Sequence, residues 1–564
     1  MDRLMMNGRR IDAIWWSLPF VALILFAAIQ VASGVYFYIF MHDLFVPLEG
    51  ALHLRYGHLP HRDFGSPVGA LYFVLHYIPT LVTPLSASTV IYANVLVALL
   101  VAAGTMLFAR HRFPLWLASI TALYLGLTAA SPRQIGEPFA VITNNASYNR
   151  FSWALIGLLA IVAACPRPDL TRRSSLLDGL AAGILLTALF FIKLTYALAA
   201  IGIVVLAIIT VRRLSDWRFA AGAFGFLAAT VLLVEVSTGL VHLYLADLAT
   251  AAAVATDVFR PVFAVRLLFY CASGAVAALV VGLIWEWDQP RRLFFWVPRT
   301  LLALAIVLAG VAIGIQNHPE FENPLLPVAV LIAGYPSLRF LRRAASLPNV
   351  AKDPRAPGSF DAQPPGVRRM AGIACAAGFL GMAAAPMAQD VAGIAWTVVA
   401  PRAQGEAIAW IADTPLADLR LFDTGPPPSP RNGAARPIND VYMLELFGDA
   451  VSLVRSHIGT RKDAVVLPTT FSNPYPALMG LPPVRHELAW WHLYRTFSLE
   501  LKPDADKLLS GVDYVLVPKI LRDPTSRGFQ QAYAAELERD FRQVDENRSW
   551  RLLARRNCRA RALC

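Results

Sequence analysis

Residues 41–77 read MHDLFVPLEGALHLRYGHLPHRDFGSPVGALYFVLHY, and this stretch decides how the whole chain is interpreted. It follows a long apolar run and is polar at both ends. Asp43 comes directly after that run, so we expect its carboxylate near a membrane–water boundary. Residues 46–56 predict a short amphipathic helix in the interface. A Gly-Ser-Pro turn at residues 65–67 then precedes an apolar helix too short to span. We treat residues 42–83 as an interfacial loop.

The composition is typical of a membrane protein. Of 564 residues, 57% are hydrophobic and 16% are charged, whereas soluble domains have about 45–50% and 25%. This excludes a soluble enzyme, a disordered protein and a small disulfide scaffold. The net charge of +12 would suggest nucleic acid, but the basic residues lie mostly between apolar stretches, where they orient membrane spans. We therefore expect membrane lipids and no nucleic acid as partners.

A membrane-spanning helix needs about 20 mostly apolar residues. The first apolar run is too long for a signal peptide and is followed by no cleavage site, so we expect it to be retained. Eleven stretches qualify as spans: residues 13–41, 87–109, 114–131, 149–165, 177–192, 194–211, 219–238, 261–285, 294–315, 324–341 and 370–390.

The connections between these stretches alternate in charge. By the positive-inside rule the basic set is cytoplasmic, which puts the N-terminus inside and everything after about residue 391 outside. The basic set contains Arg9, Arg10, Arg110, Arg112, Arg167, Arg172, Arg173, Arg212, Arg213, Arg291, Arg292, Arg339, Arg342 and Arg343. The predicted fold is mainly α: a polytopic membrane helix bundle of about 11 spans (residues 1–390) with a small extracytoplasmic α/β domain (residues 391–564).

The tail has the composition of a globular domain. Residues 440–458 have helical periodicity, residues 464–467 and 514–517 are β-rich, and a further helix is expected around residues 530–542. Weaker strand candidates are residues 419–422 and 550–553. The aromatic segment RHELAWWHLYRTF at residues 485–497 predicts a core or domain-docking helix, with sugar contact as the alternative. Residues 468–476 follow a predicted strand, where α/β folds often place binding groups.

The first loop resembles a known superfamily. The phrases that carry the resemblance are His42-Asp43, Gly57-His58-Leu59-Pro60-His61-Arg62-Asp63-Phe64 and Pro67-Val68-Gly69-Ala70-Leu71-Tyr72. They resemble the GT-C superfamily of integral-membrane glycosyltransferases, which includes family-39-like and aminoarabinose-transferase-like enzymes. The resemblance covers roughly the first 200 residues and implies a GT-C-like fold and a polyprenyl-phosphate sugar donor. Family members often carry two acids after the first span. Here the pair is His-Asp, so no cofactor is assigned and a divalent cation is left open.

Sugar transfer from a lipid phosphate to a hydroxyl needs a base and a cation for the departing phosphate. Asp43 is the candidate base, against the alternative of a solvated acid at a span end. Lys193, a lone cation between two apolar runs, is the candidate phosphate contact, against a snorkelling lysine at a turn. A Lys-x-Thr phrase in a similar position recurs in GT-C relatives, which implies the same contact. The remaining candidates are Asp63 and Glu137 among the catalytic acids, and Arg62 and Arg150 for the phosphate.

Other polar groups on the same predicted side suit an acceptor or sugar pocket. These candidates are His42, His61, Tyr148, Asn149 and His318. Each also fits a solvated loop or a span-flanking position. Histidine spacing alone is a weak metal signal, and no metal ligands are assigned.

The sequence therefore predicts an inverting glycosyltransferase, a hexosyl- or pentosyltransferase, in a bacterial inner (plasma) membrane. Its donor would be a polyprenyl-phosphate sugar, and its acceptor a cell-envelope glycan, lipid or protein. One alternative is a transporter or flippase of lipid-linked sugars, which would need polar groups along a mid-membrane path; few are visible. Another is a non-catalytic anchor for the outside domain, for which eleven spans are hard to explain.

Overall fold

A computed structural model describes most of the chain. The predicted span at 261–285 and the pocket candidate His318 lie outside the described residues. The structure describes residues 2–37, 42–144, 146–168, 171–212, 216–255, 293–316, 322–346, 365–403, 408–409, 413–421, 440–519 and 524–556.

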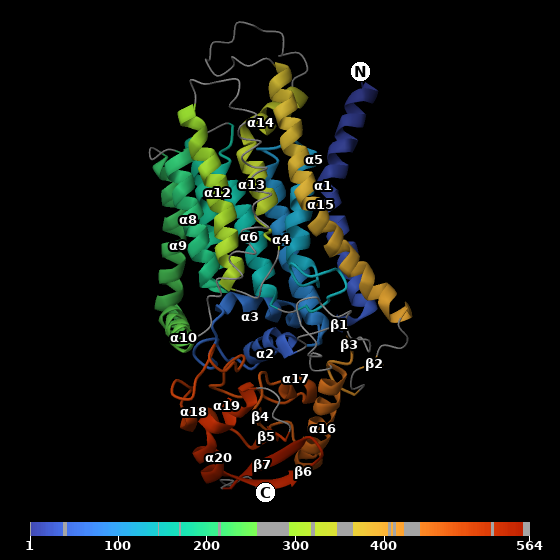
Figure 1. Ribbon diagram of the computed structural model, residues 1–564, viewed down its shortest axis with the longest axis vertical. Helices are drawn as coiled ribbons and strands as arrows, with labels where there is room; N and C mark the ends of the chain where they lie inside the picture. Colours follow the sequence, from blue (N-terminus) through green and yellow to red (C-terminus); the bar gives the residue numbers. More distant parts are fainter. Residues whose placement is uncertain are drawn as a thin grey trace.

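The larger part of the molecule is a bundle of helices (Figure 1). Seven helices in the described residues are long and apolar enough to cross a membrane, and shorter apolar helices pack among them. This confirms a mainly α, multi-pass membrane protein. The bundle helices are α1 (Asp2–Ser33), α4 (Ser88–Ala109), α5 (Leu115–Ala130), α6 (Ser147–Ala164), α7 (Arg172–Ile192), α8 (Leu194–Ala207), α9 (Trp217–Thr238), α10 (Leu240–Val254), α12 (Leu293–Gln316), α13 (Leu326–Ala333), α14 (Tyr335–Ser346) and α15 (Pro365–Ala403).

Two helices differ from the spans that hydropathy predicts. The stretch at 324–341 is divided between α13 and α14 at Gly334. Pro336 has no backbone N–H and sits near the start of the new helix, where proline is well tolerated. The last predicted span, 370–390, belongs to the longer helix α15, which continues to Ala403 and therefore passes the predicted domain boundary at residue 391.

Burial separates the centre of the bundle from its edge. In the most apolar stretch of α6, 89% of all residues are buried, against 17% in the corresponding stretches of α1 and α9. Large apolar side chains such as Ile24 and Val236 are exposed on these outer helices. In a membrane protein such side chains face lipid, so α6 forms the centre of the bundle and α1 and α9 lie at its edge.

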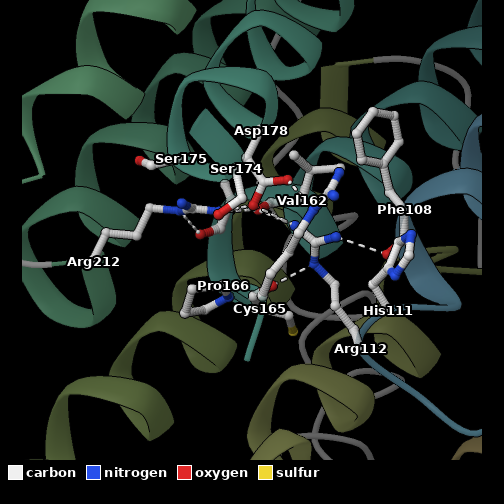
Figure 2. A network of polar contacts seen from close by, with 12 residues as sticks. Phe108, His111, Arg112, Val162, Cys165, Pro166, Ser174, Ser175, Asp178 and Arg212 are labelled. Atoms are coloured by element: carbon white, nitrogen blue, oxygen red, sulfur yellow. Dashed lines mark hydrogen bonds and ion pairs between the residues drawn. The ribbon is translucent and has the colours of Figure 1, made fainter. Parts of the chain in front are cut away.

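Three of the predicted cytoplasmic connections meet at one buried carboxylate (Figure 2). Asp178 near the start of α7 accepts hydrogen bonds from Arg112 at 2.6 Å and Arg212 at 3.0 Å. Arg167 reaches the other carboxylate oxygen at 3.0 Å. Arg112 follows α4 and Arg167 follows α6. Arg212 ends the π-helical turn Ile208–Arg212 that continues α8. The three basic connections therefore share one end of the bundle.

Two helices of the interfacial loop cover the other end of the bundle (Figure 1). They are α2 (His42–Arg55) and α3 (Ala70–Tyr77), and a short 3-10 turn at Ile78–Leu81 follows. A helix forms where residues 46–56 predict one, but residues 44–53 are all buried, so the expected amphipathic character, with one face exposed, is not observed. Both helices are too short to span a membrane, and they lie between the bundle and the C-terminal domain.

The C-terminal domain is a small α/β unit, as predicted. Its sheet has the order β4-β5-β7-β6, with β4 and β5 parallel and the other pairs antiparallel. Its elements are α16 (Asp440–Ile458), β4 (Val466–Pro468), α17 (Tyr475–Met479), α18 (Ala505–Leu509), β5 (Tyr514–Pro518), α19 (Pro524–Ala532), α20 (Ala534–Asp540), β6 (Phe541–Glu546) and β7 (Trp550–Arg555). Leu516 and Val515 enter different apolar clusters, because successive strand residues face opposite sides of a sheet.

A second, smaller sheet ties the first helix to the C-terminal domain, which is called the outer domain below because the sequence predicts it on the outside. β1 (Val35–Phe37) follows α1 and pairs in parallel with β3 (Leu419–Leu421), which also pairs with β2 (Ile408–Ala409). Asp418 strengthens this junction, since its carboxylate accepts hydrogen bonds from the backbone of Ala87 and Ser88 at the start of α4. The C-terminal domain is thus fastened to the bundle by backbone pairing.

Candidate active site

Asp43 lies in the first turn of α2, where the positive end of the helix dipole favours a carboxylate. Its side chain is 28% exposed, and the Nε2 atom of His42 lies 3.6 Å from its Oδ1 atom. The His42 ring stands edge-on to Phe471 of the outer domain, with 4.5 Å between ring centroids. The candidate base therefore lies where the bundle meets the C-terminal domain.

Lys193 is the single residue between α7 and α8. Its extended backbone ends one helix and begins the next. The Nζ atom donates a hydrogen bond of 2.9 Å to Oδ1 of Asn149 and lies 4.7 Å from the ring centroid of Tyr148. Both partners belong to the first turn of α6, so two helix junctions determine the position of this ammonium group.

Tyr72 of α3 connects the two candidates. Its ring packs against Tyr148 in a T-shaped contact, with centroids 5.3 Å apart. Burial is the main cause that raises the pKa of Tyr72, and the nearby negative charge of Asp43 raises it further. Lys193 therefore lies against one member of this aromatic pair, and the charge of Asp43 acts on the other member, Tyr72.

Gly69 explains how α3 comes so close to the lysine turn. Its backbone N–H donates to the carbonyl of Ile192 at 2.9 Å. A Cβ atom at this position would overlap the carbonyl group of Phe191. The Pro67–Tyr72 phrase thus needs a glycine, because its backbone lies directly against the end of α7.

Asp63 and Arg62 order the loop around them. The Asp63 carboxylate accepts hydrogen bonds from the Leu59 backbone at 2.8 Å and from Arg62 at 3.0 Å, and Arg485 of the outer domain lies 3.4 Å away. Burial alone would raise the pKa of Asp63, but these hydrogen bonds and positive charges outweigh it and hold the pKa below its usual value. Arg62 is half-exposed, so its guanidinium still reaches solvent.

His61 fastens the same loop to α10. Its Nδ1 atom lies 2.9 Å from Oδ2 of Asp247, and its side chain is 1% exposed. Its ring also packs against Tyr244, with centroids 4.7 Å apart. These contacts make His61 part of the packing between the loop and α10.

Arg150 and Glu137 belong to a neighbouring buried network around Arg133. Arg150 donates to the carbonyl oxygens of Thr128 and Arg133, and Asp390 of α15 lies 3.6 Å away. The Glu137 carbonyl accepts a hydrogen bond from Arg133 at 2.9 Å. These contacts join the loop after α5 to α15, the last helix of the bundle.

The segment at 485–497 is not the helix that its pattern predicts. Its backbone bonds to other segments: His486 N–H donates to the Asp63 carbonyl, and Gly65 N–H donates to the Glu487 carbonyl. His486 and Tyr494 also have positive φ angles, which an α-helix does not accommodate. Trp491 nevertheless packs in the domain core, as predicted for this segment.

Sequence reasoning missed two residues of the site. Tyr72 was visible in the first-loop phrase, but only as part of an apolar helix. Phe471 lies in the stretch after β4, where a binding segment was expected, and its ring contacts both His42 and His492 of the outer domain. Only the fold brings these rings to His42 and Tyr148.

The sequence matches no established family profile and no curated protein. Among solved structures, the chain is similar to ArnT from Cupriavidus metallidurans bound to undecaprenyl phosphate, with a TM-score of 0.48, 12% identity and coverage of 96% of this chain and 98% of ArnT. The apo ArnT structure gives a TM-score of 0.46 at 14% identity, with the same coverage. The archaeal oligosaccharyltransferase AglB from Archaeoglobus fulgidus gives 0.35 at 14% identity, covering 88% of this chain and 69% of AglB. At these TM-scores, the assignment of function rests on the chain's own residues.

Proposed function

We propose that this protein is a GT-C-type glycosyltransferase that moves a sugar from a polyprenyl-phosphate donor to a cell-envelope acceptor. The observation that carries the proposal is that Lys193 lies over the Tyr148 ring, whose T-shaped partner Tyr72 is close enough to Asp43 to feel its charge. A partly exposed carboxylate and an ammonium group thereby share one region at the end of a membrane bundle. The first-loop resemblance to GT-C enzymes supports the same reaction.

The reaction needs one proton acceptor and one phosphate contact. The acceptor hydroxyl oxygen attacks the anomeric carbon while the bond from that carbon to the phosphate oxygen breaks. The hydroxyl proton passes to the Asp43 carboxylate, and the bonding electrons leave with the lipid phosphate. Lys193 stabilises the negative charge that grows on this leaving group. A single displacement of this kind inverts the anomeric centre.

The site's position suits a lipid-bound donor. Lys193 lies at the turn between α7 and α8, beside the start of α3, and we place the lipid headgroup at this end of the bundle. The outer domain contributes Phe471 beside His42, and an aromatic ring there can stack on a sugar. By the positive-inside rule this end of the bundle faces away from the cytoplasm, at the outer face of a bacterial inner membrane. We propose a glycan, lipid or protein of the envelope as acceptor.

The proposal is tested with Asp43→Asn in cells that lack the native gene. Mass spectrometry of envelope glycans and lipid-linked sugars should show a missing monosaccharide and an accumulated carrier, as in the deletion. Membrane insertion and the melting temperature should match the wild type. The control is Asp545→Asn, because Asp545 also pairs with a histidine, His457, at 2.9 Å and lies on the outer domain's surface. Normal transfer by Asp43→Asn would refute the assignment.

An assay with purified protein distinguishes the transporter alternative. Purified wild-type protein in proteoliposomes should transfer sugar from a lipid-linked donor to an added envelope extract. Movement of the lipid-linked sugar across the bilayer without transfer would instead identify a flippase.

A further inference from the structure

Three ionisable side chains meet in the buried contact between α2 and the outer domain. Glu49 and His53 lie four residues apart on α2 and so share one helix face. Glu487 comes from the outer domain. All three are at most 2% exposed, and His53 Nε2 lies 3.4 Å from Glu487 Oε1. This cluster is separate from the Asp43–Lys193 pair.

One atom of each side chain is left without a hydrogen-bond partner. These atoms are Glu49 Oε1, His53 Nε2 and Glu487 Oε1. The other carboxylate oxygens are held by Asn473, whose backbone N–H donates to Glu49 at 3.3 Å and whose side chain donates to Glu487 at 3.4 Å. Buried polar atoms without partners are costly. Two of the three atoms are carboxylate oxygens and the third is an imidazole nitrogen, which is a donor set that suits a cation.

The far side of the His53 ring contacts a second histidine, and the Nε2 atom of His53 is the one that faces Glu487. His53 Nδ1 lies 3.0 Å from Nδ1 of His58, so one of the two rings donates and the other accepts. If His58 accepts, His53 carries its proton on Nδ1. Phe64 stacks on the His53 ring at 4.3 Å and holds its plane.

We propose that Glu49, His53 and Glu487 form a binding site for one zinc ion. Their ligand atoms all lie within 4.8 Å of one another. Zinc bonds of about 2.0–2.2 Å at tetrahedral angles place neighbouring ligand atoms about 3.4 Å apart, and the His53–Glu487 distance equals this value. Two carboxylates balance the charge of Zn²⁺, a water molecule completes the tetrahedron, and the His58 contact orients the imidazole from behind.

The consequence of the site is a fixed position for α2. Two ligands lie on the helix whose first turn carries Asp43, and the third lies on the outer domain. An ion bound here would join the two parts of the molecule through a single centre. Its role would be to position α2, without contacting the sugar or the lipid phosphate.

The test measures zinc in the purified full-length protein. The protein is stripped with a chelator, incubated with ZnCl₂, desalted and analysed by elemental mass spectrometry. The wild type should retain one zinc ion per chain, and His53→Gln and Glu487→Gln should each bind zinc more than about tenfold more weakly. The control is His457→Gln, which removes an exposed histidine paired with Asp545 and should retain the ion.

Two further readouts separate zinc binding from misfolding. Added ZnCl₂ should raise the melting temperature of the stripped wild type, because a ligand that binds only the folded state stabilises it. Added ZnCl₂ should leave the melting temperature of Glu487→Gln unchanged. X-ray absorption at the zinc edge should show oxygen and nitrogen ligands including one imidazole. A wild type without retained zinc, or equal retention by all variants, would overturn the proposal and favour a proton shared between the Glu49 and Glu487 carboxyl groups. These measurements need no glycosyl transfer, so they stand apart from the proposed function.

Discussion

Lys193 and Asn149 are 44 positions apart, yet their side chains share a hydrogen bond of 2.9 Å. Tyr196 OH donates to the same amide oxygen at 3.4 Å. Asn149 therefore gathers two donors at the start of α6 and keeps the ammonium group over the Tyr148 ring. The position of the proposed phosphate contact is thus set by three helices, α6, α7 and α8.

Replacing Lys193 with Gln should slow sugar transfer by about 10²–10³-fold, the usual cost of removing one group that stabilises developing charge. The loss should appear mainly in kcat, measured with a radiolabelled lipid-linked donor. Lys502→Gln is the control, since that lysine also lies over a tyrosine ring, Tyr533 at 4.6 Å, within the outer domain. Equal rates for both variants would contradict a phosphate role for Lys193.

Gly69→Ala should destabilise the protein by about 1–3 kcal/mol, the usual cost of forcing a group into a packed site. The added methyl would push the loop away from Phe191 and displace the lysine turn, so transfer should also fall. Gly202→Ala in α8 is the matched control, because nothing lies within 4 Å of its Cβ position. Thermal unfolding in detergent should show a lower melting temperature only for Gly69→Ala.

Asp178→Asn should destabilise the folded chain by about 3–5 kcal/mol, because it leaves several buried guanidinium groups without their counter-charge. Asp506→Asn removes a partner of Arg539, but Asp506 is 83% exposed, so its loss should cost less than about 1 kcal/mol. Yields of folded protein and melting temperatures compare the two. Similar stability of both variants would show that the arginines are neutralised in another way.

Asp63 predicts a defined pH dependence. Since its pKa is lower in the folded state than the usual 3.8, its ionised form stabilises the fold above that pH. This contribution should disappear as the pH falls through the lowered pKa. The melting temperature of the wild type should therefore exceed that of Asp63→Asn at pH 6, and the difference should shrink towards pH 3. A constant difference across this range would exclude the ion pair as its source.

The fold was predictable where hydrophobic periodicity is strong. Residues 440–458 form α16 as expected, and the β-rich runs form β4 and β5. Periodicity failed at residues 485–497, because backbone bonds to Asp63 and Gly65 prevent a helix there. Such bonds depend on a partner more than 400 positions away, which a local pattern does not contain.

The candidate site was predictable by residue type and only partly by arrangement. Asp43 and Lys193 stood out because charge next to an apolar run is costly unless it has a purpose. The partners of His61 and Arg150 were not foreseeable, since Asp247 and Asp390 reach them through the fold. The same holds for Glu487, which shares no local motif with Glu49 or His53.

The parallel pairing of β1 with β3 joins a segment made early in translation to one made much later. While the ribosome is still synthesising the bundle, Val35–Phe37 has no strand beside it, and α2 lacks the surface that later covers it. The surroundings of Asp43 are therefore complete only after α15, the last helix of the bundle, has inserted and Phe471, which contacts His42, has emerged. Biosynthesis itself would thus delay the first turnover until the whole polypeptide is in place.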